Sequence, residues 1–245
     1  MIDLERATST RLTVDGRNSS PVWSPDGERI TFSTTRPGTG TNLYWKPADG
    51  SGEVQSHFRG EHPRWSISWS PDGEILAFYE IHPATGRDIW LWSPGEDPVP
   101  FLVTPFSERS PMLSPTGRWL AYASDETGRD EVYVLSYPEP EAKQQISRDG
   151  GREPVWSRDG RELFYRNGDN MMVVDVETGP VFRAGTARAL FEGRYRVAAG
   201  GLNQNYDVAP DGQRFVMVRA AGESGPPQIR LVLNWFEELK AKVGN

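Results

Sequence analysis

The chain has 245 residues, a formal net charge of −7, 36% hydrophobic residues and no cysteine. The acidic balance disfavours nucleic-acid binding, because neutralising phosphates requires a basic stripe that the sequence lacks. Without cysteine the chain has neither disulfides nor thiolate metal sites. The 25 Gly and 20 Pro, spread at short intervals, favour many turns over long helices.

The N-terminus begins without a recognisable signal or a complete repeat. Residues 1–6 lack the basic and apolar parts of a secretory signal, and no window approaches the ~18 apolar residues that span a bilayer. We therefore expect no membrane span, and a chain that is either cytoplasmic as given or a piece of a longer protein. Within residues 1–13, Asp3–Glu5 and Thr10–Thr13 are predicted to be the last two strands of a partial repeat.

A hairpin motif follows and organises the rest of the chain. In its first copy, residues 21–32, alternating residues flank the turn Ser24-Pro25-Asp26-Gly27. Proline fixes φ there, aspartate caps its own backbone, and glycine accepts a positive φ. Four degraded copies follow, and the turn glycines lie 46, 44, 43 and 52 residues apart, at Gly27, Gly73, Gly117, Gly160 and Gly212.

This period predicts an all-β fold, a β-propeller of four-stranded antiparallel blades. Apolar residues three and five positions after each glycine indicate a second strand, and a third strand comes about sixteen positions after it. A weaker, more polar fourth strand fits an outer edge. We expect one domain over residues 1–245, with a partial repeat at 1–13 and five full repeats at 14–59, 60–105, 106–149, 150–197 and 198–233.

The C-terminal segment changes pattern. Asn234 with Glu237 three residues later, lysines in the last turn and a following glycine predict a short helix over 234–243. Its apolar face, with Trp235 and Leu239, should cover the last blade.

The repeated Trp-Ser-Pro-Asp-Gly hairpin resembles the WD40-like repeats of the TolB type of bacterial β-propeller. Three segments are also similar to the propeller that follows the kinase domain in certain bacterial Ser/Thr protein kinases: residues 42–50, 162–169 and 232–240. The resemblance implies an interaction or sensing module, possible fusion to a larger protein, and a periplasmic or extracytoplasmic place in related parents. It also implies further repeats upstream, which leaves the closure of the ring open.

Few residues suggest catalysis or metal binding. The three histidines, His57, His62 and His82, lack the spacing of a zinc site, so we predict neither a metal nor a cofactor. The repeated turn aspartates are explained by turn chemistry, since Thr116 replaces one of them without spoiling the hairpin.

The segments that lead into the innermost strands are more informative, because such loops converge at one mouth of a propeller channel. Polar and charged residues recur there, either as a ligand socket or as solvated loops with mutual salt bridges. The candidate binding residues are Asn18, His62, Arg64, Glu108, Arg109, Arg152, Glu153, Asn203 and Asn205.

Two functional hypotheses remain. The first is a non-catalytic module that binds a protein, a peptide or a small polar ligand at the channel mouth. The alternative is a propeller hydrolase or lactonase that uses Glu108 and Glu153 with a divalent cation. We also expect residues 10–13 to pair with residues 228–232 and close the ring, and charge reversal at Arg109 and Arg152 to weaken binding without lowering stability.

Overall fold

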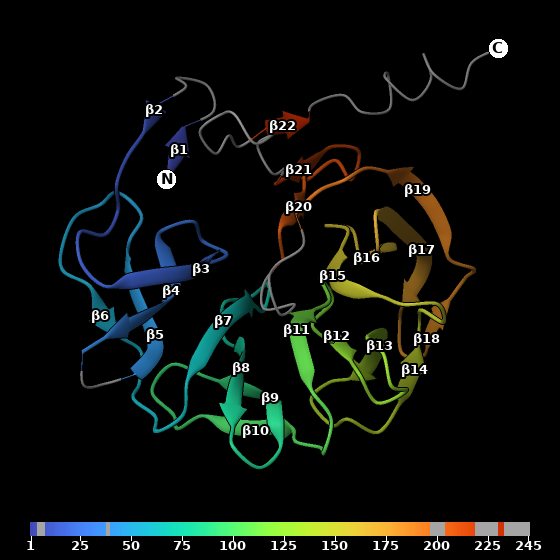
Figure 1. The fold of residues 1–245 in the computed structure, drawn as a ribbon, viewed down its shortest axis with the longest axis horizontal. Coiled ribbons are helices and arrows are strands. Elements are labelled where there is room, and N and C mark those ends of the chain that lie inside the picture. The colour runs from blue at the N-terminus through green and yellow to red at the C-terminus, as the bar shows by residue number, and fades with distance from the viewer. Residues whose placement is uncertain (4–7, 38–39, 197–203, 219–229, 233–245) are drawn as a thin grey trace. The chain divides into compact units, whose positions relative to one another are not determined.

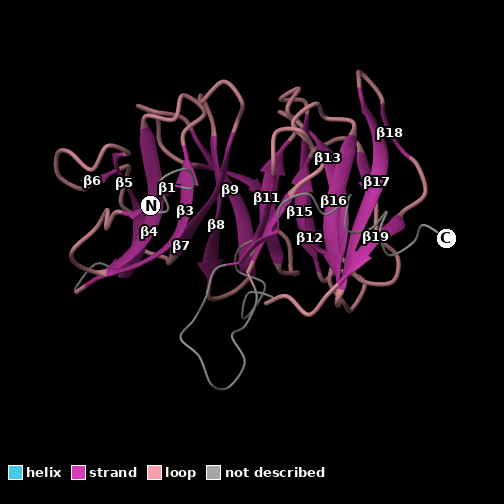
Figure 2. Ribbon diagram, turned by 90° about the horizontal axis from the view of Figure 1, so that it is seen from above, coloured by secondary structure: helices cyan, strands magenta, loops and turns pink. Residues whose placement is uncertain are grey.

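The computed structural model describes residues 1–3, 8–37, 40–196, 204–218 and 230–232, which form strands, turns and loops (Figure 1, Figure 2). These ranges contain no helix, and so none that could cross a membrane. The helix predicted over 234–243 lies outside the described residues. The chain divides into two compact units, Met1–Glu108 (unit 1) and Arg109–Asn245 (unit 2).

Unit 1 contains two four-stranded antiparallel sheets, each hydrogen-bonded in chain order. Blade 1 comprises β3 (Arg17–Trp23), β4 (Arg29–Arg36), β5 (Gly40–Pro47) and β6 (Gln55–Ser56). Blade 2 comprises β7 (Arg64–Trp69), β8 (Leu76–His82), β9 (Gly86–Trp92) and β10 (Val99–Leu102). A small sheet of β1 (Ile2–Asp3) and β2 (Thr8–Ser9) precedes them.

Unit 2 continues the same pattern. Blade 3 comprises β11 (Glu108–Leu113), β12 (Trp119–Ser124), β13 (Glu131–Ser136) and β14 (Lys143–Gln145). Blade 4 comprises β15 (Arg152–Trp156), β16 (Glu162–Asn167), β17 (Asn170–Thr178) and β18 (Phe182–Ala184), with β19 (Arg188–Glu192) also paired to β17. Blade 5 comprises β20 (Tyr206–Val208), β21 (Phe215–Met217) and β22 (Arg230–Val232). The predicted all-β propeller fold is confirmed, whereas the boundaries of its repeats stay a prediction.

The repeated turn is held by its own side chains. In the first copy, the Ser24 hydroxyl donates to Asp26 Oδ1 at 2.5 Å, and the backbone N–H of Glu28 donates to the same oxygen at 2.9 Å. These bonds, that of Ser24 first, hold the pKa of Asp26 below its usual value. In the third copy the hydroxyls of Ser114 and Thr116 lie 3.0 Å apart and take over this role. The five turn glycines have φ between +66° and +76°, as the motif predicted.

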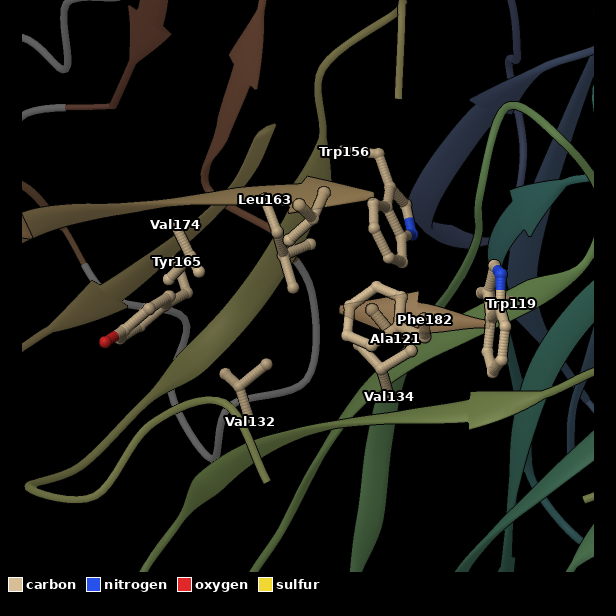
Figure 3. Close-up of a cluster of buried hydrophobic side chains, with 10 residues drawn as sticks. Trp119, Ala121, Val132, Val134, Trp156, Leu163, Tyr165, Val174 and Phe182 are labelled. Carbon is tan, nitrogen blue, oxygen red and sulfur yellow. The ribbon is translucent and has the colours of Figure 1, made fainter. Parts of the chain in front are cut away.

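Each unit has its own apolar core. In unit 1, Leu43 from blade 1 packs with Leu76, Phe78 and Trp92 from blade 2. In unit 2, blades 3 and 4 share a cluster that includes Trp119, Val134, Trp156, Leu163 and Phe182 (Figure 3). The alternation of apolar residues in neighbouring strands builds both cores, because every second side chain of a strand shares a face.

The strand predicted at Thr10–Thr13 is wrong. The short strand of this segment is β2, which pairs with β1, and residues 10–13 are irregular. Leu12 instead packs against the core of blade 1, where Lys46 Nζ donates to its carbonyl at 3.1 Å. The predicted pairing with residues 228–232 stays a prediction, since residues 228 and 229 lie outside the described ranges.

Candidate functional site

Eight of the nine candidate binding residues are described, and Asn203 is not. Unit 1 contains Asn18, His62, Arg64 and Glu108, and unit 2 contains Arg109, Arg152, Glu153 and Asn205. Within each unit they stand at or just before the start of an innermost strand, as the repeat alignment predicted. Whether the two groups share one mouth stays a prediction.

In unit 1, Arg64 is buried and forms an ion pair with Glu80, a residue that the sequence did not predict as part of the site. Arg64 is 8% exposed, and its Nε and Nη2 lie 2.6 Å and 2.5 Å from Oε2 of Glu80, which is 3% exposed. The guanidinium also lies 5.2 Å from the ring centroid of Phe58 and 5.7 Å from that of Phe78. At Gly60 a Cβ would lie 1.9 Å from Arg64 Nη1, so only glycine permits this approach. The arginine is thus a built-in part of blade 2.

The other candidates of unit 1 differ in exposure. Asn18 is exposed, and its Nδ2 donates to Thr13 Oγ1 at 2.9 Å, which secures the preceding loop. His62 is partly buried, with its ring 4.7 Å from that of His82. Glu108 is 1% exposed and accepts a 2.5 Å hydrogen bond from Thr104 Oγ1. Of these three residues, Asn18 and His62 are the ones that solvent reaches.

In unit 2, two arginines share one aspartate. Arg109 Nη1 and Nη2 lie 3.3 Å and 3.2 Å from the two carboxylate oxygens of Asp130, and Nη2 also lies 3.3 Å from Asp125. Arg152 Nε bonds Asp130 Oδ2 from the neighbouring blade. The side chain of Arg109 is only 10% exposed, whereas that of Arg152 is 47% exposed. The burial of Arg109 argues against the expected neutrality of a charge reversal there, because the change would place a buried negative charge beside Asp130.

Glu153 occupies a strained backbone position that recurs in the repeats. Among the described residues, three other than glycine have φ near +55°, Ser20, Ser110 and Glu153, and each stands seven residues before a turn glycine. The carbonyl of Ser20 accepts a 2.7 Å hydrogen bond from Ser66 Oγ of the next blade, and that of Glu153 accepts one of 2.7 Å from Tyr206 Oη. At these two positions the left-handed conformation aims a carbonyl at the next blade, so the strain has a structural cause.

The remaining candidate, Asn205, is adjacent to Glu153. Its backbone N–H lies 3.5 Å from Glu153 Oε2, and its own carbonyl accepts a 3.1 Å hydrogen bond from the Val218 N–H. Glu153 is 1% exposed, so this carboxylate faces protein groups more than solvent.

Neither the histidines nor the turn aspartates form a metal site. Among the described residues there is no group of three His, Asp or Glu side chains placed to hold an ion. His57 lies among Trp45, Trp69 and Trp92, and burial, helped by the positive charge of Arg29, lowers its pKa to about 4. Such a histidine is a neutral core residue, with its Nε2 3.0 Å from Thr31 Oγ1.

The charged partners that the sequence analysis missed are Glu80, Asp125 and Asp130. A signal existed for the first of them. Arg64 stands nine residues before Gly73 and Glu80 seven after it, and the two are direct partners in the hairpin register. The hairpin register does not predict the contact of Asp130 with Arg152, because these two residues belong to neighbouring blades.

The comparisons with known proteins support this fold. The TolB of Acinetobacter baumannii is 19% identical with a TM-score of 0.61, and the match covers 84% of this chain and 50% of that one. A protein assigned as TolB from Agrobacterium tumefaciens is 20% identical with a TM-score of 0.59, covering 69% of this chain and 63% of that one. An oligogalacturonate lyase from Vibrio parahaemolyticus is 15% identical with a TM-score of 0.59, covering 89% and 68%.

At these identities the solved structures show the fold alone, and the chain spans less than two thirds of either TolB structure. No curated protein matches the sequence. The closer resemblance to kinase-linked propellers stays a prediction. A family model described as the TolB β-propeller domain matches residues 1–158, which is more than half of the chain. The chain therefore belongs to the TolB β-propeller domain family.

Proposed function

We propose that the chain is a non-catalytic interaction module that binds a protein, a peptide or a small polar ligand through the residues at the starts of its innermost strands. One observation carries the proposal. Arg152 stands at such a start with a side chain that is 47% exposed, although its Nε bonds Asp130. The remaining N–H groups can serve a carboxylate or carbonyl of a ligand, since a guanidinium has five donors.

Exposure separates two roles among the candidates. Asn18, His62 and Arg152 are accessible and would contact the ligand. Arg64, Glu108, Arg109 and Glu153 are each no more than 8% exposed and would shape the surface from below. Asn203 and Asn205 complete the proposed set. Within unit 2, a ligand at Arg152 would meet an exposed guanidinium beside the buried ion pair of Arg109 with Asp130, and such charge placement favours specificity more than raw affinity.

The enzymatic alternative has less support. Glu108 and Glu153, its proposed metal-binding carboxylates, are each 1% exposed, and each has a protein donor within hydrogen-bond reach. Solved structures similar to this chain include peptidases and lyases. Their sequence identity to this chain is low, so the similarity shows the fold alone. A rise of several degrees in the melting temperature with calcium or magnesium would favour the enzyme, because a ligand that binds only the native state stabilises it.

The direct test selects peptides from a random display library on the intact chain. Binding of the selected peptides should weaken at least tenfold in Arg152→Glu, and the difference should shrink at high salt because exposed charges are screened. The matched control is Arg161→Glu in the same sheet, whose side chain is 84% exposed at the turn end of β16. Peptides that bind Arg152→Glu as tightly as the unchanged chain, or a library that yields none, would overturn the proposal.

A further inference from the structure

Blade 2 contains a cavity of about 480 Å³ that lies entirely within unit 1. Its polar side is formed by Glu80 and His82 of β8 and Asp88 of β9. Its other side is formed by Trp90 of β9 and by Phe101 and Val103 at the outer strand. The cavity therefore brings carboxylates and apolar groups together in a space large enough for a small organic group.

Asp88 is the unusual group in this wall. It is 2% exposed, and its Oδ2 accepts a 2.6 Å hydrogen bond from Thr85 Oγ1. Its Oδ1 is buried without a hydrogen-bond partner. Burial, more than the nearby charge of Glu80, raises the pKa of Asp88 above its usual value. A buried acceptor without a donor has a free-energy cost that a ligand donor would remove.

Among the described residues, no Lys or Arg side chain bonds the carboxylate of Asp88. Glu80 pairs with Asp88 in the strand register, but the carboxylate of Glu80 is bonded to Arg64 of β7. His82 faces the site from β8 and favours the ionised form of Asp88. The Arg64 guanidinium carbon already lies 6.0 Å from the centroid of the Trp90 ring, so the group in this wall that is suited to a cation is the unmatched carboxylate oxygen of Asp88.

We propose that this cavity binds an organic cation, a primary ammonium or guanidinium group on a short apolar stem. The cation donates to Asp88 Oδ1, and the stem packs against Phe101 and Val103. An inorganic ion fits less well, because half of the wall is apolar and Glu80 is already engaged by Arg64. The inference stands independently of the proposed role of the strand-start residues.

The binding test uses the intact chain and small probes. Butylguanidinium and butylammonium, titrated by calorimetry, should bind, and 1-pentanol, an uncharged molecule of similar size, should not. Affinity should rise as the pH increases from 4 to 7, since the ionised form of Asp88 binds the cation. Asp88→Asn should weaken binding at least tenfold while keeping an acceptor for Thr85. Asp97→Asn removes the same charge from an exposed position between β9 and β10 and should change nothing.

A second variant guards against misfolding. Val103 is 49% exposed, so Val103→Trp can fill the cavity from its rim without disturbing the core, and it should abolish binding. Probes that do not bind, or that bind Asp88→Asn or Val103→Trp undiminished, would overturn the inference. Arg152→Glu should leave cation binding intact, which separates this site from the proposed interaction site.

Two further probes identify the natural source of the cation. N-acetyl-arginine methylamide and N-acetyl-lysine methylamide present the same groups on a peptide backbone. If they bind at least as tightly as the free cations, the cavity accepts a basic side chain of a partner protein. If only the free cations bind, the cavity serves a small-molecule amine.

Discussion

Units 1 and 2 hold a buried arginine at nearly the same place in the repeat, by different means. Arg64 of unit 1 stands nine residues before its turn glycine, bonds Glu80 and lies over aromatic rings. Arg109 of unit 2 stands eight before its glycine and bonds both Asp125 and Asp130. Within the part of the chain that the structure describes, Arg64 thus bonds one carboxylate and Arg109 bonds at least two.

This difference indicates that the repeat fixes where a charge is buried but not how it is compensated. In unit 2 the compensation also links blades, because Asp130 of blade 3 bonds Arg152 of blade 4. In unit 1 it stays within one hairpin, between β7 and β8. Unit 1 should therefore be more sensitive to the loss of one carboxylate.

The largest expected loss of stability comes from breaking the ion pair between Arg64 and Glu80 in unit 1. Glu80→Ala leaves the guanidinium of Arg64 buried without its carboxylate, which should cost about 3–5 kcal/mol of unfolding free energy. Urea unfolding measures this cost. The matched change in unit 2, Asp125→Ala, should cost no more than about 1 kcal/mol, because Asp125 is 39% exposed and Arg109 keeps Asp130.

A double variant tests the cause. Arg64→Met combined with Glu80→Ala should recover part of the loss, since no unpaired charge then remains buried. Equal costs for Glu80→Ala and Asp125→Ala would contradict the comparison of the two units.

A second difference between the units is acid sensitivity, because all three histidines belong to unit 1. The pKa of His57 falls from 6.5 to about 4 in the folded state. The unfolded chain therefore binds this proton first, and stability present above pH 6.5 is lost as the pH falls toward 4. The loss should reach about 3 kcal/mol. His57→Gln should flatten the curve of unfolding free energy between pH 4 and 7, and parallel curves for the two proteins would exclude the effect.

The smallest expected loss of stability comes from changing the turn glycines, which both units share. Gly73 of unit 1 and Gly117 of unit 2 have φ of +76° and +66°. Changing either to valine should cost more than ~1 kcal/mol, because a β-branched residue is strained there. Thermal unfolding should give similar losses for both, since no atom lies within 4 Å of a Cβ at Gly117 and the nearest at Gly73 is 3.7 Å away. A cost near zero at either glycine would mean that the turn does not need its conformation.

The structural features that the sequence predicted best are those that depend on residues close together along the chain. The hairpin turns, the strands on either side of them and the structural role of Asp26 follow from local hydrogen bonding. The strand expected at residues 10–13 failed because one apolar residue in a short segment fits a strand or a core contact equally well. In the structure, Leu12 makes the core contact.

The sequence predicted where the candidate residues stand along the strands but not which residues they contact, and their role in binding stays a prediction. The repeat alignment located Arg64, Arg109 and Arg152 at the strand starts. Their carboxylates lie far along the chain, and Asp130 bonds Arg152 from another blade. Such a contact depends on how blades pack, which spacing does not encode. The unmatched Asp88 Oδ1 was likewise invisible, because burial of a single atom has no sequence signature.

The carbonyls of Ser20 and Glu153 have a consequence for how the molecule unfolds. Each is turned toward the next blade, where Ser66 or Tyr206 donates to it at 2.7 Å. A blade that frays from its neighbour therefore loses a hydrogen bond and also leaves a left-handed backbone without its compensation. In a repeat array, where stability is approximately a sum of repeat and interface terms, such a contact strengthens the interface term. Blades 1 and 2, and blades 4 and 5, should consequently open in pairs rather than one at a time.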